Sequence, residues 1–193
     1  MTKGTVRAFI CFEIDQHVSA ALGRLIDEGR ALGERISWSK PEKIHLTLKF
    51  LGDIENAQVE QVSQIVRQLA EKQREFKLTI DKLGAFPNFQ RPRVFWVGTT
   101  DVPAELNTLV TELEDALAQI GFARECRAFA PHLTLGRAKS DRCAQTAGFL
   151  KTKQLESRKV HCAELVLMKS DLQPSGAVYT PLATFDLQPG KHV

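Results

Sequence analysis

The tetrapeptide His-Leu-Thr-Leu occurs twice in this chain of 193 residues, at residues 45–48 and again at residues 132–135. Side chains on a β-strand point alternately to opposite faces, so each copy places its histidine and threonine on one face and its leucines on the other. Packing alone would require the leucines but not the polar pair. We therefore interpret each copy as half of a single site.

The residue types of the motif suit phosphate chemistry. Imidazole gives or takes a proton near neutral pH, and a threonine hydroxyl can donate a hydrogen bond to an anionic oxygen. If the two strands face each other across a groove, one histidine can activate water and the other can protonate the departing oxygen, while the threonines hold the phosphoryl oxygens. This scheme requires no metal.

Length, charge and cysteine usage limit the class of protein. The length favours one domain with two lobes, and a formal net charge of +3 argues against a broadly basic, non-specific nucleic-acid binder. No apolar run reaches membrane-spanning length, and the N-terminal residues lack the apolar core of a signal peptide. We expect a soluble, cytoplasmic monomer whose four widely separated cysteines are reduced thiols: Cys11, Cys126, Cys143 and Cys162.

Apolar periodicity predicts the same order of elements in both halves of the chain. The first half is expected to hold a strand at 7–14, a helix from Asp15 to Gly33, a histidine strand at 44–51, a helix around 59–69, and strands at 76–83 and 94–99. The second is expected to hold a helix at 103–121, a histidine strand ending at 138, a short helix at 141–150, and strands at 160–169 and 177–185. This repetition predicts two α/β lobes that meet at the histidines, with a boundary near 100–103.

The chain resembles the 2H phosphoesterase superfamily, and within it the RNA 2′,3′-cyclic phosphodiesterases once called 2′-5′ RNA ligases. The resemblance is carried by the two motifs and their spacing, and it extends over nearly the whole chain. The other matching segments are Arg7-Ala8-Phe9-Ile10, Phe50-Leu51-Gly52, Gly136-Arg137, Leu167-Met168-Lys169-Ser170, and Tyr179-Thr180-Pro181-Leu182.

This resemblance implies a bilobal α+β fold in which antiparallel-rich sheets flank a central cleft. It implies hydrolysis of terminal 2′,3′-cyclic phosphates on RNA to 2′-phosphates, without metal or other cofactor, with tRNA fragments among the candidate partners. His45 and His132 would then be the acid–base pair, and Thr47 and Thr134 the phosphate ligands. The same chemistry run backwards would form a 2′-5′ linkage.

Two residues that follow the motifs are candidates for further substrate contacts. Regular alternation is taken to place Arg137 on the face of His132 and Thr134, where it would be a third phosphate contact; the alternative is a solvated arginine at the strand end. Parity is likewise taken to place Phe50 beside His45, where its ring would stack a nucleobase; the alternative is packing.

Other residues near the motifs are weaker candidates for contacts with RNA. The loop that carries Phe86, Phe89, Arg91 and Arg93 could grip RNA, or its rings could cover a core edge. Nearby lysines would raise the local positive potential, or each would be a solubilising charge: Lys40, Lys43, Lys49 and Lys139.

Three alternatives stay open. A zinc site built from His45, His132 and Cys126 is conceivable, although the chain has no closely spaced ligand pair. An RNA-end binding module would use the groove without turnover. A phosphodiesterase acting on small cyclic nucleotides or on ADP-ribose cyclic phosphate would share the histidines without needing the aromatic loop.

Overall fold

The computed structural model describes residues 4–140, 143–174 and 176–190. The elements along the chain are β1 (Thr5–Glu13), α1 (Gln16–Arg30), β2 (Ile36–Trp38), the 3₁₀ helix η1 (Pro41–Lys43), β3 (His45–Glu55), α2 (Asn56–Ala70), β4 (Phe76–Ile80), β5 (Lys82–Phe86), β6 (Val94–Gly98), α3 (Ala104–Gln119), β7 (His132–Ala138), α4 (Ala144–Thr152), β8 (Arg158–Cys162), β9 (Glu164–Gln173) and β10 (Gly176–Asp186).

The two histidine strands lie next to each other in the middle of one antiparallel sheet. The sheet runs in the order β10-β9-β1-β3-β7-β6-β5, and β2 pairs with β7. The strands β3 and β7 pair where Leu46 lies opposite Leu133, the residues that follow the two histidines. The predicted meeting of the two motifs is therefore confirmed.

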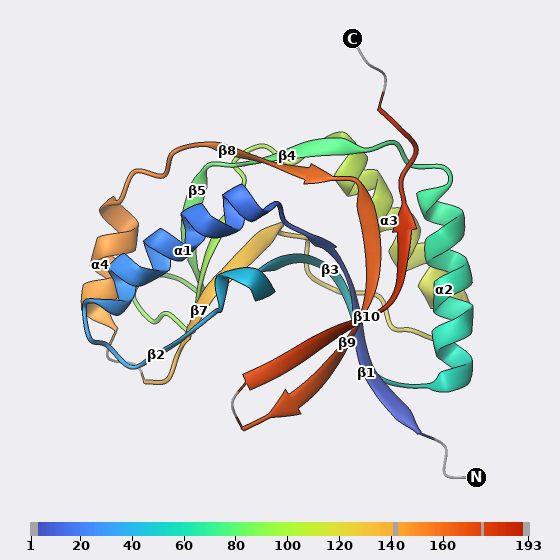
Figure 1. Cartoon of the computed structure of the whole chain (residues 1–193), viewed down its shortest axis with the longest axis horizontal. Helices are drawn as coiled ribbons and strands as arrows, with labels where there is room; N and C mark the ends of the chain where they lie inside the picture. Colours follow the sequence, from blue (N-terminus) through green and yellow to red (C-terminus); the bar gives the residue numbers. More distant parts are fainter. Residues whose placement is uncertain (1–3, 141–142, 175, 191–193) are drawn as a thin grey trace.

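Both halves of the sequence contribute strands to each side of this junction. On one side β9 returns from the end of the chain to pair with β1, and β10 pairs with β9. On the other side β6 from the first half pairs with β7, and β5 pairs with β6. Figure 1 shows α1 and α4 at one end of the molecule and α2 and α3 at the other. Residues 100–103 remain our proposed division between the two repeats of the sequence.

The helices form where the apolar spacing predicts them. Val18, Leu22, Leu25 and Ile26 are buried along α1, which gives that helix one apolar stripe. Asp15, where we expected this helix to begin, makes no side-chain capping hydrogen bond and instead accepts one from the backbone N–H of His161 at 3.2 Å. The predicted start of the short helix at residue 141 lies outside the described residues.

Two predicted strands are each divided in the structure. Residues 76–83 split between β4 and β5, and residues 160–169 split between β8 and β9. The strands β4 and β8 leave the main sheet and form a two-stranded sheet of their own. Hydrophobic alternation shows which face of a segment is buried but not which strand will be its partner, so periodicity could not reveal these breaks.

The described residues show neither a membrane-spanning helix nor a disulfide. No helix in the described part of the chain has both the length and the apolar character needed to cross a membrane. All four cysteines are free, and three of them are buried: Cys11, Cys143 and Cys162.

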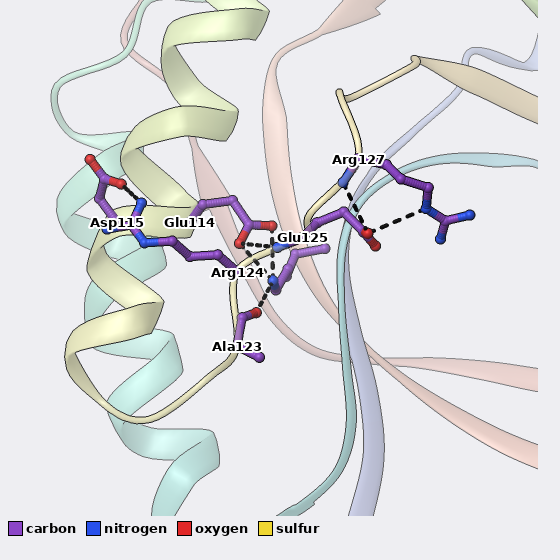
Figure 2. Close-up of polar contacts among 7 residues, drawn as sticks. Glu114, Asp115, Ala123, Arg124, Glu125 and Arg127 are labelled. Carbon is purple, nitrogen blue, oxygen red and sulfur yellow. Dashed lines mark hydrogen bonds and ion pairs between the residues drawn. The ribbon is translucent and has the colours of Figure 1, made fainter.

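A buried ion pair connects the first histidine strand to the segment before the second. The Nζ atom of Lys49 donates to both carboxylate oxygens of Glu114 on α3, at 2.9 and 2.7 Å, and to the carbonyl of Ala123 at 2.7 Å. Glu114 also accepts from the backbone N–H of Glu125, at 3.2 Å (Figure 2). Because its charge is neutralised here, Lys49 does not supply the free positive potential considered for it above.

Removing one member of this pair should destabilise the fold. The side chains of Lys49 and Glu114 are only 8% and 15% exposed, so Lys49→Met would leave a carboxylate largely buried without its cation. We expect the free energy of unfolding, measured by urea denaturation, to fall by about 3 kcal/mol.

The neighbouring residue on α3 supplies a matched control. Asp115 pairs with Arg124 in a contact where both side chains are more than half exposed, so Asp115→Asn should cost less than about 1 kcal/mol. Equal losses in the two variants would contradict a structural role for the Lys49–Glu114 pair.

Candidate active site

One cavity of about 420 Å³ gathers all six residues that the sequence singled out. His45, Thr47 and Phe50 come to it from β3, and His132, Thr134 and Arg137 come to it from β7. Its other walls include residues from β1, β9 and β10 and from the segment before β3. The site is thus assembled at the junction of the two repeats.

A β-bulge in each motif strand sets which residues reach the cavity. In β3, Thr47 lies opposite Cys11 and Lys49 lies opposite Ile10, so Leu48 has no partner on β1. Leu48 and Lys49 are both buried, whereas Phe50 is 65% exposed and lines the cavity. The extra residue moves Phe50 to the face of His45.

The second strand repeats this bulge at the matching position. Trp96 lies opposite Thr134 and Phe95 opposite Gly136, so Leu135 has no partner on β6, and Arg137 reaches the cavity. The predicted placements of Arg137 and Phe50 are therefore correct, but the reason given for them was wrong. Each residue follows its histidine by an odd number of positions, and regular alternation would have turned it to the opposite face.

Each imidazole ring is held by a hydrogen bond to the backbone carbonyl two residues before it. Nδ1 of His45 lies 2.9 Å from the carbonyl oxygen of Lys43, and Nδ1 of His132 lies 2.8 Å from that of Ala130. A carbonyl only accepts hydrogen bonds, so Nδ1 must carry a proton in each ring. In a neutral ring Nε2 is then the nitrogen that can accept a proton from water or substrate.

Each histidine also lies against a pair of aromatic rings. Phe9 stacks on His45 at 4.7 Å between ring centroids, and Tyr179 meets the same ring edge-on at 5.1 Å. Around His132, Phe86 makes an edge contact at 5.0 Å and Trp96 a tilted contact at 6.3 Å. Phe9 and Trp96 come from equivalent strands, since β1 and β6 are the direct neighbours of the two motif strands, whereas Tyr179 comes from β10 and Phe86 from β5.

This environment lowers the pKa of both histidines below the ordinary value of 6.5. Burial is the main cause, because it disfavours the charged imidazolium, and the hydrogen bond from Nδ1 opposes it in each case. The charge of His132 lowers the pKa of His45 further, and the charge of Arg137 does the same for His132. The two histidines are therefore electrostatically coupled across the cavity.

Two glycines make room for the Trp96 ring. A Cβ atom at Gly84 would lie 2.1 Å from the nearest ring atom of Trp96, and one at Gly98 would lie 2.9 Å from this ring and 2.7 Å from the carbonyl oxygen of Pro131. Larger residues at either position would force the ring to move toward other atoms. The glycines thus allow a large aromatic side chain to lie beside His132.

The polar groups of the cavity leave hydrogen-bonding capacity for an anion. No described residue bonds the hydroxyl of Thr47 or Thr134, whereas the backbone carbonyl of Thr134 accepts from Ser39 Oγ at 2.8 Å. Lys43 lines the cavity and donates to the carbonyl of Ala177 at 2.7 Å. Together with Arg137, these groups suit a negatively charged ligand.

The remaining candidates lie elsewhere. Lys40 and Lys139 are not among the cavity-lining residues, and neither are Arg91 and Arg93 of the aromatic loop. Phe89 packs against the core, which is the covering role considered as the alternative for this ring, whereas Phe86 belongs to β5 and packs on His132.

The zinc alternative finds no support in the described residues. Within residues 4–140, 143–174 and 176–190, no group of three or more His, Cys, Asp or Glu side chains is placed to hold a metal ion. Cys126 is exposed and is not a lining residue of the cavity that holds His45 and His132.

Sequence reasoning missed four residues that shape the site. Phe9, Trp96 and Tyr179 surround the histidines, and Ser39 bonds the backbone of the second motif. Phe9, Trp96 and Tyr179 come from strands far from the motifs in sequence, and Ser39 bonds a residue 95 positions away. Only knowledge of the strand order could have placed them there.

Comparison with known proteins gives a consistent result. Residues 12–96 and again residues 97–179 match the family described as LigT-like phosphoesterase, so each matched segment contains one motif. A protein of Methanothermobacter thermautotrophicus named RNA 2′,3′-cyclic phosphodiesterase is 31% identical, over 94% of this chain and 99% of its own length. The protein of the same name from Aquifex aeolicus is also 31% identical, over 94% of this chain and 97% of its own.

Solved structures agree with the sequence relatives. A crystal structure described as a phosphoesterase is 25% identical with a TM-score of 0.73, covering 96% of this chain and 99% of the other. Escherichia coli LigT in complex with 3′-AMP is 26% identical with a TM-score of 0.72, covering 95% and 99%. These comparisons confirm the predicted family and the predicted bilobal α+β fold.

The aromatic pairs predict that two matched substitutions each affect a different histidine. Phe9→Leu should admit water to the ring of His45 and raise its pKa toward 6.5, and Trp96→Leu should do the same for His132. An NMR titration of the imidazole C–H resonances would measure both midpoints in each variant. Each substitution should move mainly the midpoint of its own histidine; equal movement of both, or of neither, would contradict the assigned environments.

Proposed function

Because this chain belongs to the LigT-like phosphoesterase family of the 2H superfamily and is a phosphoester hydrolase, we propose that its substrates are RNA ends carrying a 2′,3′-cyclic phosphate. The products would be 2′-phosphomonoesters. The observation that carries this proposal is the convergence of His45 and His132 on one cavity, each with its Nδ1 engaged by a backbone carbonyl. The names of the relatives supply the substrate class.

In the proposed mechanism the two histidines divide the work of proton transfer. One neutral imidazole takes a proton from water at Nε2 as the water oxygen attacks phosphorus in line with the 3′-oxygen. The other, as imidazolium, gives a proton to the 3′-oxygen as its bond to phosphorus breaks. The 2′-oxygen keeps its bond to phosphorus, so the product is a 2′-phosphate.

The remaining polar side chains would bind the phosphate. Thr47 and Thr134 have free hydroxyls that can donate to the two non-bridging oxygens, whose negative charge grows as water adds. Arg137 would add a charge-assisted hydrogen bond. The aromatic pairs keep the histidines desolvated, which strengthens these interactions.

The proposal also covers the reverse reaction, the cellular compartment and the source of the RNA. A 5′-hydroxyl that replaces water as nucleophile would give a 2′-5′ linkage, although water is in large excess over RNA ends. We place the protein in the cytoplasm, as a monomer acting on RNA fragments such as those of tRNA. The free cysteines are compatible with that compartment.

A phosphodiesterase of small cyclic nucleotides is the second candidate. The cavity of about 420 Å³ is within the usual size range of small-ligand pockets. Comparing a cyclic-phosphate-ended oligonucleotide with the cyclic mononucleotide would separate the two candidates by their kcat/KM values.

Replacing either catalytic histidine should nearly abolish turnover. His45→Ala and His132→Ala each remove one proton-transfer group, so we expect kcat to fall by roughly 10²–10⁴-fold with the fold retained. The assay would use an oligonucleotide ending in 2′,3′-cyclic phosphate, with chelator present, and would identify which hydroxyl keeps the phosphate.

His161→Ala is the matched control, because His161 lies outside the cavity and pairs with Glu75. It should retain the parent rate. Near-parent turnover in either cavity variant would defeat the acid–base assignment, and tight RNA-end binding without phosphate hydrolysis would favour a binding module.

The threonine hydroxyls can be tested with a substitution that keeps their shape. Thr47→Val and Thr134→Val each remove a hydrogen-bond donor while preserving the branched side chain. We expect kcat/KM to fall by roughly 10²-fold in each variant, with little change in the urea midpoint. A loss confined to stability would point to packing instead of phosphate binding.

A further inference from the structure

One end of the cavity carries apolar and cationic side chains that the proposed binding of the reacting phosphate does not involve. Phe50 and Leu172 both line the cavity and are 65% and 71% exposed, among the few large apolar side chains left open to solvent in the described chain. Arg7 lines the same region, is exposed, and makes no hydrogen bond or ion pair with another described residue. Apolar side chains and a free guanidinium therefore occur together.

Strand pairing gives the order of these groups along the cavity. On β1, Cys11 lies opposite Thr47, Phe9 opposite Phe50, and Arg7 opposite Asp53. Four residues of strand separate Cys11 from Arg7, which is about 13 Å at the usual rise per residue. Arg7 is thus too far along the strand to share the phosphate held by Thr47, and Phe50 lies between the two positions.

The hairpin of β9 and β10 covers the other side of this end. The pairing of β1 with β9 runs from Ala8 opposite Lys169 to Cys11 opposite Val166, so continuing it places Arg7 opposite Ser170. Beyond this point the hairpin projects away from the rest of the sheet (Figure 1). Ser170 and Leu172 on β9 line the cavity, and they alternate with Lys169 and Asp171, which pair with each other.

The acidic residue opposite Arg7 on β3 leaves the guanidinium available. Asp53 lies opposite Arg7 on β3 and is exposed, but no ion pair joins them. Lys43 also lines the cavity and adds positive charge. A guanidinium in this setting suits a phosphate oxygen, because a charge-assisted hydrogen bond to an oxyanion is stronger than one between neutral groups.

We propose that Arg7 binds a second phosphate group of the substrate, the one on the 5′-oxygen of the nucleotide whose cyclic phosphate is cleaved. The ribose of that nucleotide would span the distance between the two phosphates, and its base would lie over Phe50 and against Leu172. This inference rests on the proposed function, and it gives a reason for preferring RNA ends, since a nucleoside 2′,3′-cyclic phosphate has no 5′-phosphate.

The smallest pair of probes that tests this differs only at the 5′ position. Adenosine 2′,3′-cyclic phosphate and the same compound bearing a 5′-phosphate would be compared by kcat/KM in the parent protein, where we expect the 5′-phosphate to raise kcat/KM about tenfold. In Arg7→Gln this ratio should fall to near one, and in Arg7→Lys it should be partly retained. Arg24→Gln, on the exposed face of α1, should keep the parent ratio.

Each result has a defined meaning. If the parent hydrolyses neither probe nor a cyclic-phosphate-ended oligonucleotide, the proposed function fails. If it hydrolyses both probes equally well, or if Arg7→Gln keeps the parent ratio, the assignment of Arg7 is wrong while the proposed function stands. Circular dichroism of Arg7→Gln would show that a lost ratio does not come from misfolding.

Discussion

The single point of pairing between β3 and β7 is the contact on which the site depends. Leu46 and Leu133 are fully buried, and each directly follows a histidine of the motif. Their pairing fixes the spacing of the two imidazoles through rigid strands, which hold side chains more accurately than loops do. The buried leucines therefore determine the geometry of the cavity, although they do not line it.

The repeated sequence produces a repeated environment as well as a repeated motif. Each strand has the same bulge, each ring donates from Nδ1 to the carbonyl two residues before it, and each lies against two aromatic side chains. The positions after the bulges differ, because one is Phe50 and the other Arg137. The symmetry of the two imidazoles is thereby combined with an asymmetric cavity wall, to which β3 contributes an aromatic ring and β7 a guanidinium.

Much of this molecule could be predicted from its sequence, for identifiable reasons. The helices and the two histidine strands carry clear periodicity, and the duplication indicated that the motifs meet. The bulge in β3 could not be read, because the alternation of polar and apolar residues continues unbroken from Thr47 through Leu48 to Lys49. The burial of Lys49 and the aromatic contacts of His45 depend on partners distant in sequence, which local patterns do not reveal.

The exchange of strands between the two repeats makes the enzyme indivisible. A chain cut near residues 100–103 would give one fragment with β1 and β3 but without β9, and another with β7 but without β6. Each fragment would expose unpaired strand edges and half an apolar core, so neither could fold by itself into a stable lobe. The surroundings of both histidines therefore depend on the sheet being assembled from both halves of the chain.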